Sequence, residues 1–342
     1  MTRDQDERFL VTGALGCIGA WTVRALASEG VPVVAFDLGS DARRLRLIMT
    51  DDELAAVTFV RGDITDIASV EAALDANAIT NVIHLAALQV PFCRADPPRG
   101  ALVNVVGTVN VFEAVKRRAD RMGPIVYTSS IGMYAAADAD AATGRLAEGA
   151  TAHPLNHYGV YKQANEGTAR VYWLDDGLSS IGLRPTTVYG VGRDQGMTSG
   201  PTKAIVAALL GVPYTIGFGG STLFQYVDDV ARTLLAASTS RLDGAPVFNL
   251  GGSVASMTQL VETIESIVPE ARGLVTFDPT PLPFPAEIDH DGLAALGPVP
   301  VTRLGDGIAA SAEIYRDLAR RGRLVASEQG LEPPAPDVAR LV

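Results

Sequence analysis

Three glycines, each separated from the next by two residues, stand between an apolar run and an amphipathic segment near the N-terminus. The apolar run is residues 9–12, the glycines are Gly13, Gly16 and Gly19, and a helix is predicted over 18–28. Such a turn needs backbone angles open to glycine and leaves no side chain against a phosphate at the helix N-terminus. A tight turn without a ligand is the alternative. Because the glycines follow a predicted strand and precede a predicted helix, they favour a dinucleotide site.

The alternation of strands and helices continues through the first half of the chain. Strands are predicted over 31–37, 57–60, 81–85 and 125–128, and helices over 67–77, 98–118 and 157–175. This order predicts an α/β fold with a Rossmann-type doubly wound parallel sheet. After Ser180 the rhythm loosens. We expect an NAD-binding domain over residues 1–180 and a smaller, mainly substrate-binding lobe over 181–342. The sequence does not decide whether the chain passes back from the second lobe to the first.

An acidic residue, Asp37, ends the second predicted strand. Its carboxylate can accept hydrogen bonds from both hydroxyls of an adenosine ribose and repels a 2′-phosphate, which favours NAD over NADP. Arginine can bind a 2′-phosphate, but Arg43 and Arg44 stand six and seven residues further on, so we interpret them as a solvated helix face. Asp63 ends the third strand. It could bind the adenine amine or cap the helix that follows, and both roles stay open.

Composition excludes several classes of protein. A formal charge of −11 over 342 residues argues against nucleic acid, whose phosphates demand a basic surface. No apolar run reaches the roughly 18 residues needed to cross a bilayer. The charged segment 1–8 is not a signal peptide. Cys17 and Cys93 fit a reducing compartment and lack the spacing of a metal site or a disulfide framework. We expect a cytoplasmic protein with no metal and no membrane partner.

A tyrosine and a lysine stand four residues apart on the helix predicted over 157–175. This spacing puts Tyr158 and Lys162 on one helix face. Free tyrosine, with a pKa of about 10, is a poor base at neutral pH, and a neighbouring ammonium lowers that pKa. An ordinary half-buried tyrosine is the alternative, but beside the glycine turn the pair favours proton transfer. Tyr161 has no lysine at this spacing and is expected to pack or to form the pocket wall.

Taken together, these motifs resemble the extended short-chain dehydrogenase/reductase superfamily, in particular its NAD-dependent epimerase/dehydratase branch. The resemblance spans about residues 8–235. It is carried by the glycine turn, Gly62-Asp63, His84-Leu85-Ala86-Ala87, Asn104-Val105-Val106-Gly107-Thr108, Thr128-Ser129-Ser130, the Tyr158/Lys162 pair and Arg184-Pro185. It implies an enzyme that transfers hydride between NAD and a secondary alcohol or ketone.

The resemblance also assigns catalytic roles to the first domain. Ser130 follows the fifth predicted strand and is implied to hold the reacting oxygen near the Tyr158 phenol. Tyr158 takes the alcohol proton while hydride leaves the carbon. Lys162 is implied to stabilise the phenolate and to bind the nicotinamide ribose.

Further residues are implied to surround the cofactor. Ala86 and Ala87 are expected to lie over it, Asn104 to support it from the next helix, and His84 to be a packed strand residue rather than an acid or base. The residues expected to bind NAD are Gly13, Gly16, Cys17, Ile18, Gly19, Asp37, Asp63, Ile64, Leu85, Ala86, Ala87, Asn104, Thr128, Tyr158, Lys162 and Pro185.

Two departures from the family pattern narrow the reaction. Sugar-nucleotide dehydratases of the family carry an acid pair where this chain has Ile131 and Gly132, so dehydration is not expected. Leu223 replaces an arginine that reaches the diphosphate of nucleotide sugars, which weakens that substrate class. Arg193 could instead grip a carboxylate or phosphate, although a solvated loop arginine fits the sequence equally well. The residues expected to contact substrate are Gln89, Ser130, Gly132, Arg193 and Gln225.

We therefore predict an NAD-dependent oxidoreductase or epimerase for a small sugar, sugar acid or polyol-like substrate. A nucleotide-sugar 4-epimerase is the alternative, and a non-catalytic NAD(P) sensor is a remote one. Helices over 98–116 and 157–171 resemble those that pair in family dimers, and apolar residues such as Val103, Val106, Val109 and Phe112 predict a homodimer.

Overall fold

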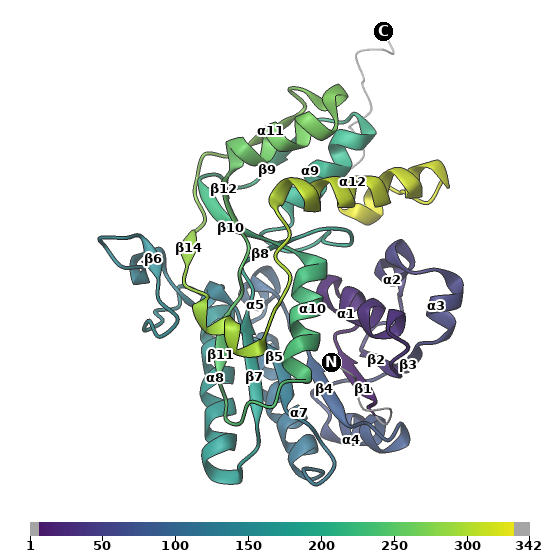
Figure 1. Cartoon of the computed structure of the whole chain (residues 1–342), viewed down its shortest axis with the longest axis vertical. Coiled ribbons are helices and arrows are strands. Elements are labelled where there is room, and N and C mark those ends of the chain that lie inside the picture. The colour runs from purple at the N-terminus through teal and green to yellow at the C-terminus, as the bar shows by residue number, and fades with distance from the viewer. Residues whose placement is uncertain (1–6, 332–342) are drawn as a thin grey trace.

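A seven-stranded, wholly parallel sheet forms the centre of the larger lobe (Figure 1). The computed structural model describes residues 7–331. Most of the charged N-terminal segment 1–8 therefore lies outside the described residues. The strand order is β11-β7-β5-β4-β1-β2-β3, which confirms the doubly wound prediction. The strands are β1 (Phe9–Thr12), β2 (Val33–Asp37), β3 (Thr58–Arg61), β4 (Asn81–His84), β5 (Ile125–Thr128), β7 (Ser180–Arg184) and β11 (Val247–Asn249).

Apolar side chains on both faces hold this sheet between two layers of helices. Alternate residues of β1 point to opposite faces, so Val11 packs with Trp21 on one side and Leu10 packs with Phe36 on the other. Both faces are covered, which explains why the strand is apolar throughout. Helices α1 (Cys17–Ser28) and α10 (Val227–Ser238) cover the first face, and α4 (Ile67–Ala76), α7 (Gly107–Lys116) and α8 (His157–Asp176) cover the second.

One predicted helix is interrupted. In place of a continuous helix over 98–118, the chain forms α6 (Pro97–Ala101), a π-helical turn (Leu102–Val106) and then α7. The wider turn buries Asn104, whose side chain accepts a hydrogen bond from the Leu88 amide at 2.7 Å and donates one to the Leu88 carbonyl at 2.9 Å. Such turns occur often at functional sites. This one fixes the loop that follows β4.

A smaller lobe packs above the carboxyl ends of the strands (Figure 1). Its sheet has the order β12-β10-β8, and α9, α11 and α12 form its helical layer. The bounds are β8 (Thr187–Tyr189), α9 (Gly200–Leu210), β10 (Ser221–Tyr226), β12 (Ser253–Ser256), α11 (Met257–Ile267) and α12 (Leu304–Arg320). Strand pairs β9 (Tyr214–Ile216) with β13 (Val275–Phe277), and β6 (Arg145–Leu146) with β14 (Glu287–Ile288), complete it.

The chain crosses between the lobes more than once. Helix α10 packs against α1, and β11 joins the large sheet beside β7, although both lie after residue 181. The Trp21 indole of α1 donates a hydrogen bond to the Val191 carbonyl at 2.9 Å, on the loop that follows β8. These links hold that loop over the N-terminus of α1. Across residues 7–331, none of the helices combines the length and the apolar character that a membrane span requires.

Candidate active site

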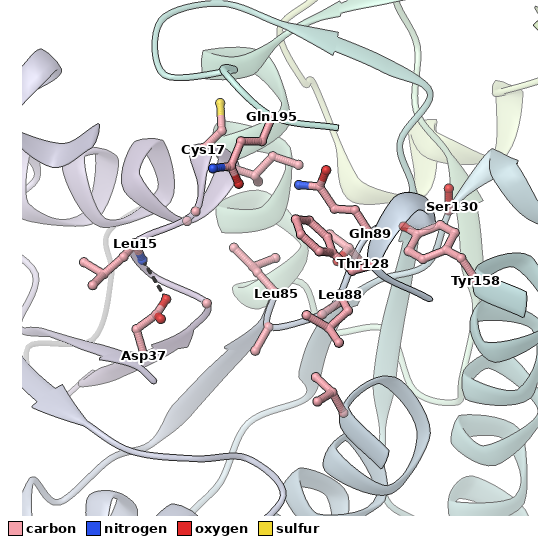
Figure 2. A pocket seen from close by; sticks show the side chains of 18 of the residues that line it. Leu15, Cys17, Asp37, Leu85, Leu88, Gln89, Thr128, Ser130, Tyr158 and Gln195 are labelled. Carbon is pink, nitrogen blue, oxygen red and sulfur yellow. Dashed lines mark hydrogen bonds between the residues drawn. The ribbon is translucent and has the colours of Figure 1, made fainter. Parts of the chain in front are cut away.

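A cavity of about 1000 Å³ lies at the carboxyl ends of the parallel strands, where both lobes contribute to its walls (Figure 2). The glycine turn after β1 forms one end, and Ser130 with Tyr158 forms another part of the wall. Helices α2 (Arg43–Ile48) and α5 (Val90–Ala95) border the same space. Parallel sheets bind their ligands in this position.

The glycine turn has the shape that the sequence predicts. Gly13 has a left-handed φ of +68°, and a side-chain carbon there would lie 2.7 Å from the Ala86 nitrogen. A Cβ on Gly19 would collide with the Gly13 carbonyl, so α1 can approach β1 only through a glycine. Gly16 caps α1 in an extended conformation. The result is a bare backbone cradle at a helix N-terminus, which fits the pyrophosphate of NAD.

Two carboxylates, Asp37 and Asp63, line the cavity beside the glycine turn. The Asp37 carboxylate accepts hydrogen bonds from the Leu15 and Gly39 amides, each at 3.0 Å, and still lines the cavity (Figure 2). Asp63 also lines the cavity and accepts two bonds from Thr65 at 2.8 Å. The N-cap of α4 is Asp66, so the capping role considered for Asp63 is wrong.

Arg43 and Arg44 are not the solvated helix face that the sequence suggested. Their guanidinium groups lie 2.7 Å and 2.6 Å from the two carboxylate oxygens of Asp194. Only 15% of the Arg44 side chain is exposed. Spacing from Asp37 along the chain could not reveal this, because the partner lies about 150 residues away in the other lobe.

Ser130 and Tyr158 meet at the end of β5. The Ser130 hydroxyl accepts a hydrogen bond from the Gly132 amide at 3.0 Å, which fixes its direction. The Tyr158 phenol lies near it, and Figure 2 shows the two side chains together in the cavity wall. Lys162 is buried, and its ammonium donates to the Thr128 carbonyl at 2.6 Å, 5.6 Å from the centre of the Tyr158 ring.

The electrostatics of this pair differ from the expectation. Burial raises the pKa of Tyr158, and the Ser130 hydroxyl and the charge of Arg193 offset this only in part. Lys162, the partner expected to lower that pKa, is itself buried. Burial lowers its own pKa from 10.5 to about 8, because a desolvated ammonium is unfavourable. In this structure burial outweighs the lowering expected from a neighbouring ammonium, and the net pKa of Tyr158 is raised.

A buried ion pair between Arg184 and Glu166 lies beside the end of β5, and the sequence patterns did not predict it. Arg184 donates to the Glu166 carboxylate at 2.8 and 2.7 Å, and the Ser129 hydroxyl donates to the same carboxylate at 2.5 Å. Glu166 follows Lys162 by four residues on α8. The i, i+4, i+8 spacing from Tyr158 was the signal that could have identified it. The pair ties α8 to β7 and fixes the end of β5.

His84 and Cys93 are packed groups behind the cavity. The His84 ring bonds to Thr12 at 2.7 Å and to Thr108 at 3.1 Å, and burial with the nearby Lys162 charge lowers its pKa to about 3. A neutral, doubly hydrogen-bonded ring matches the predicted strand role. Burial likewise raises the pKa of the Cys93 thiol, which approaches the Leu88 carbonyl.

The structure brings most of the predicted site residues to one cavity. Those that line it are Gly13, Gly16, Cys17, Ile18, Gly19, Asp37, Asp63, Ile64, Leu85, Ala86, Ala87, Gln89, Thr128, Ser130, Gly132, Tyr158, Lys162, Pro185 and Arg193. Asn104 and Gln225 do not line it. The Gln225 amide instead accepts from Thr186 and donates to the Leu250 carbonyl, each at 2.8 Å, so the substrate contact expected of it is wrong. Within residues 7–331, no cluster of metal-binding side chains occurs.

The loop at 190–199 supplies polar groups to the cavity wall. Arg193 donates to Thr198 at 3.2 Å, while its buried Nε has no hydrogen-bond partner among the described residues. The same is true of Gln89 Oε1, which lies against Gly196. Leu223 is buried in an apolar cluster with Ile131. Unsatisfied polar atoms in a cavity wall are expected where a polar ligand completes the site.

Comparisons with known proteins agree with this geometry. The profile of the NAD dependent epimerase/dehydratase family matches residues 9–251. The chain is 32% identical to UDP-glucose 4-epimerase of Mycolicibacterium smegmatis over 318 residues, which cover 91% of this chain and 99% of the relative. It is 29% identical to UDP-glucuronate 4-epimerase 3 of Arabidopsis thaliana, with 93% and 78% covered.

A solved structure shows the same likeness in three dimensions. MoeE5, in complex with UDP-glucuronic acid and NAD, superposes with a TM-score of 0.74 at 29% identity, covering 91% of this chain and 99% of that one. The prediction of an NAD-dependent enzyme of the extended short-chain dehydrogenase/reductase type is confirmed. The matched residues include the glycine turn, Ser130 and Tyr158, and the chain belongs to the NAD-dependent epimerase/dehydratase family.

Proposed function

We propose that this enzyme is an epimerase that inverts one secondary carbinol carbon of a sugar by removing and returning a hydride. The main support is that Ser130 and Tyr158 line the same cavity as the dinucleotide cradle and lie side by side in its wall (Figure 2). Ile131 and Gly132 supply no acid beside this pair, which argues against dehydration. Hydride removal and return need only an oxygen-holding group and one group that can accept and then donate a proton.

The chain supplies the proton chemistry of this reaction. When bound, NAD takes up the hydride from the carbinol carbon and returns it to the ketone carbon. Ser130 holds the reacting oxygen, and the Tyr158 phenolate accepts the hydroxyl proton as the C–O bond becomes C=O. In the second half of the reaction the Tyr158 phenol gives the proton back. Because burial raises the pKa of Tyr158, we expect the oxidation step to accelerate as the pH rises.

The substrate we propose is a sugar that carries one anionic group, a carboxylate or a phosphate. Arg193 supports the anionic group, because its buried Nε donor has no partner at the cavity wall. The unpartnered Gln89 Oε1 is an acceptor, which suits a sugar hydroxyl. Arginine recognises both anions through its planar array of donors. Gly132 leaves room beside Ser130 for the sugar ring, since a side chain there would approach the Ser130 hydroxyl to 3.2 Å.

A nucleotide sugar is the second candidate substrate. The similarity to UDP-glucose 4-epimerase over nearly the whole chain favours it. The buried, apolar position of Leu223 argues against it, because β10 then offers no cation to a diphosphate at that position. Arg193 is the cation that would have to serve either substrate.

We also propose a cytoplasmic homodimer, with residues 1–180 mainly binding NAD and 181–342 mainly binding substrate. Support for the dimer comes from exposed apolar side chains on two neighbouring helical segments, Leu102 and Val106 before α7, and Val160, Val171 and Leu174 on α8. Adjacent exposed apolar side chains of this kind mark association surfaces.

Phe112 does not belong to this surface. Its ring is fully buried and stacks on Tyr172 with the ring centres 5.1 Å apart. The expectation that it contributes to the dimer is therefore wrong, because α7 turns this side chain toward the sheet.

Replacing Tyr158 with phenylalanine removes only the phenolic oxygen. We expect NAD binding to persist and the rate of hydride transfer to fall by about 10²–10⁴. Ser130→Ala is expected to cost less. Tyr161→Phe is the matched control, because the Tyr161 hydroxyl donates to the Pro97 carbonyl at 2.9 Å, and we expect this variant to keep the wild-type rate. If Tyr158→Phe turned over substrate at the wild-type rate, the assignment of Tyr158 as the acid/base would be wrong. Tyr161 and His157 would then be the next candidates.

The function itself is tested by incubating the enzyme with sugars, sugar acids, sugar phosphates and UDP-sugars, and resolving epimers by NMR. We expect an epimer to appear without net NADH. Arg193→Gln should raise KM by about 10-fold or more with a smaller effect on kcat, because a charged hydrogen bond is lost. Arg99→Gln, also in the cavity lining, serves for comparison. Stoichiometric NADH release would instead identify a dehydrogenase.

Asp37→Ala is expected to narrow the preference for NAD over NADP, because the carboxylate no longer binds the ribose hydroxyls or repels a 2′-phosphate. Calorimetric dissociation constants for both dinucleotides measure this. Asp52→Ala, on an exposed part of α3 (Asp51–Ala55), should leave the ratio unchanged. A wild-type enzyme that prefers NADP would contradict the assignment.

Light scattering at micromolar concentration tests the dimer. We expect the mass of two chains for the wild type and a shift toward one chain for Val171→Asp, which places a charge on the exposed apolar face of α8. Val254→Asp, on an exposed part of β12, is the matched control. A wild-type monomer would refute the proposal.

A further inference from the structure

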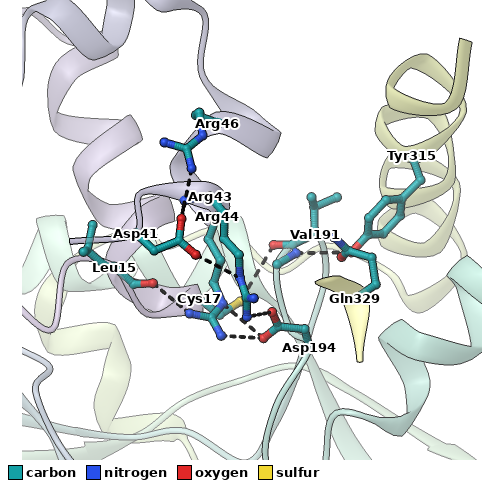
Figure 3. A network of polar contacts seen from close by, with 11 residues as sticks. Leu15, Cys17, Asp41, Arg43, Arg44, Arg46, Val191, Asp194, Tyr315 and Gln329 are labelled. Atoms are coloured by element: carbon teal, nitrogen blue, oxygen red, sulfur yellow. Dashed lines mark hydrogen bonds and ion pairs between the residues drawn. The ribbon is translucent and has the colours of Figure 1, made fainter. Parts of the chain in front are cut away.

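One carboxylate joins the two lobes across the cofactor end of the cavity. Asp194 Oδ2 lies 2.7 Å from an Arg43 nitrogen, and Oδ1 lies 2.6 Å and 3.0 Å from two nitrogens of Arg44 (Figure 3). Only 4% of the Asp194 side chain is exposed. Close, charge-assisted contacts away from water are the strong kind of ion pair. We call these three residues the clasp.

The clasp connects parts of the chain that are far apart. Arg43 and Arg44 begin α2, just after the strand that ends in Asp37, whereas Asp194 lies between β8 and α9 in the smaller lobe. Arg44 also donates to the Leu15 carbonyl at 2.9 Å, inside the glycine turn. All three clasp residues line the same cavity as that turn. The clasp therefore spans from the ribose end, past the glycine turn, to the smaller lobe.

The loop that carries Asp194 is firmly held at its base. The Val191 carbonyl accepts from Trp21, and the Gly192 amide donates to the Tyr315 hydroxyl at 3.2 Å. Gly192 and Gly196 have φ values of +88° and +97°, which bracket the turn containing Asp194. Beyond this base, the ion pairs of Asp194 are charged contacts that hold the turn against α2.

The charges of the clasp suit a site that encloses an anion. Arg43 and Arg44 share the Asp194 carboxylate, and Asp41 adds a second carboxylate 3.8 Å from Arg43 and 2.9 Å from Arg46 (Figure 3). These three arginines and two aspartates carry one net positive charge, and Arg44 links it to the glycine turn through its bond to the Leu15 carbonyl. A dinucleotide in the cavity would lie against the clasp, because all three clasp residues line it.

We propose that the clasp keeps NAD in its site between turnovers and that Asp194 determines how slowly the cofactor is released. The inference rests on the proposed function in one respect, because an epimerase regains its starting cofactor each cycle and needs no exchange. An enzyme that released NADH at every turnover would be slowed by the same contact.

The test measures cofactor release from the full-length enzyme in the absence of substrate. The protein is loaded with NADH, excess NAD is added, and the loss of bound NADH fluorescence gives the release rate. Asp194→Asn keeps the shape of the side chain and removes its charge. We expect release to become faster by about 10- to 100-fold, as when one partner of a buried charge pair is lost. Added salt should accelerate release from the wild type more than from the variant.

A matched control replaces an aspartate whose ion pairs lie on the surface. Asp317 contacts Arg320 and Arg321 at 3.3 Å and 2.8 Å on α12, and Asp317→Asn should leave the release rate unchanged. If Asp194→Asn does not fold, Arg43→Gln keeps the contact between Arg44 and Asp194, and we expect a smaller increase in release. Circular dichroism and melting curves show whether Asp194→Asn is folded.

Two results would overturn the inference. Unchanged release from a folded variant would show that the clasp does not control departure of the cofactor. Slower release would show that the arginines grip the pyrophosphate and that Asp194 merely competes for them. Because no substrate is present, either result leaves the proposed epimerase reaction untouched. A failed epimerase assay alongside faster release would overturn only the proposed function.

Discussion

The close approach of the glycine turn to the end of β4 is the contact on which the site depends. Gly13 touches the backbone at Ala86, and the Thr12 hydroxyl accepts hydrogen bonds from the Leu85 and Ala86 amides at 3.2 Å. The same hydroxyl meets His84. The bare backbone of Gly13 and the small Thr12 side chain thereby join the two strand ends. The floor of the cavity, the first turn of α1 and the loop after β4 all take their positions from this junction.

Helix α8 carries a second alignment that organises the chemistry. Tyr158, Lys162 and Glu166 follow one another at four-residue intervals. The first lies in the cavity wall, the second reaches the end of β5, and the third anchors Arg184 beneath it. Separating Glu166 from Arg184 would leave an uncompensated buried charge, which is unfavourable. The ion pair therefore holds α8 against β7. Because α8 is a regular helix, the ion pair at Glu166 also fixes the position of the Tyr158 phenol two turns earlier.

Sequence patterns predicted the parts of the site that lie within single strand–turn–helix units. The glycine turn, Asp37 and the Tyr158/Lys162 spacing are local features, and each lies where the pattern places it. Contacts between distant segments could not be predicted, because nothing in the local sequence pairs Arg44 with Asp194. The π-helical turn at Leu102–Val106 was not predicted either, because its residues have the apolar periodicity of an ordinary α-helix. The raised pKa of Tyr158 depends on burial, which spacing alone does not reveal.

The cysteine within the glycine motif has a chemical consequence of its own. Cys17 sits at the first turn of α1, a position that usually activates a thiol. Here burial raises its pKa to about 12, despite the nearby charges of Arg193 and Arg44, and its sulfur lies 3.8 Å from the Val191 carbonyl. The reactive thiolate is therefore scarce at neutral pH. We therefore expect Cys17 to react slowly with peroxide and alkylating reagents, although it stands at the helix N-terminus.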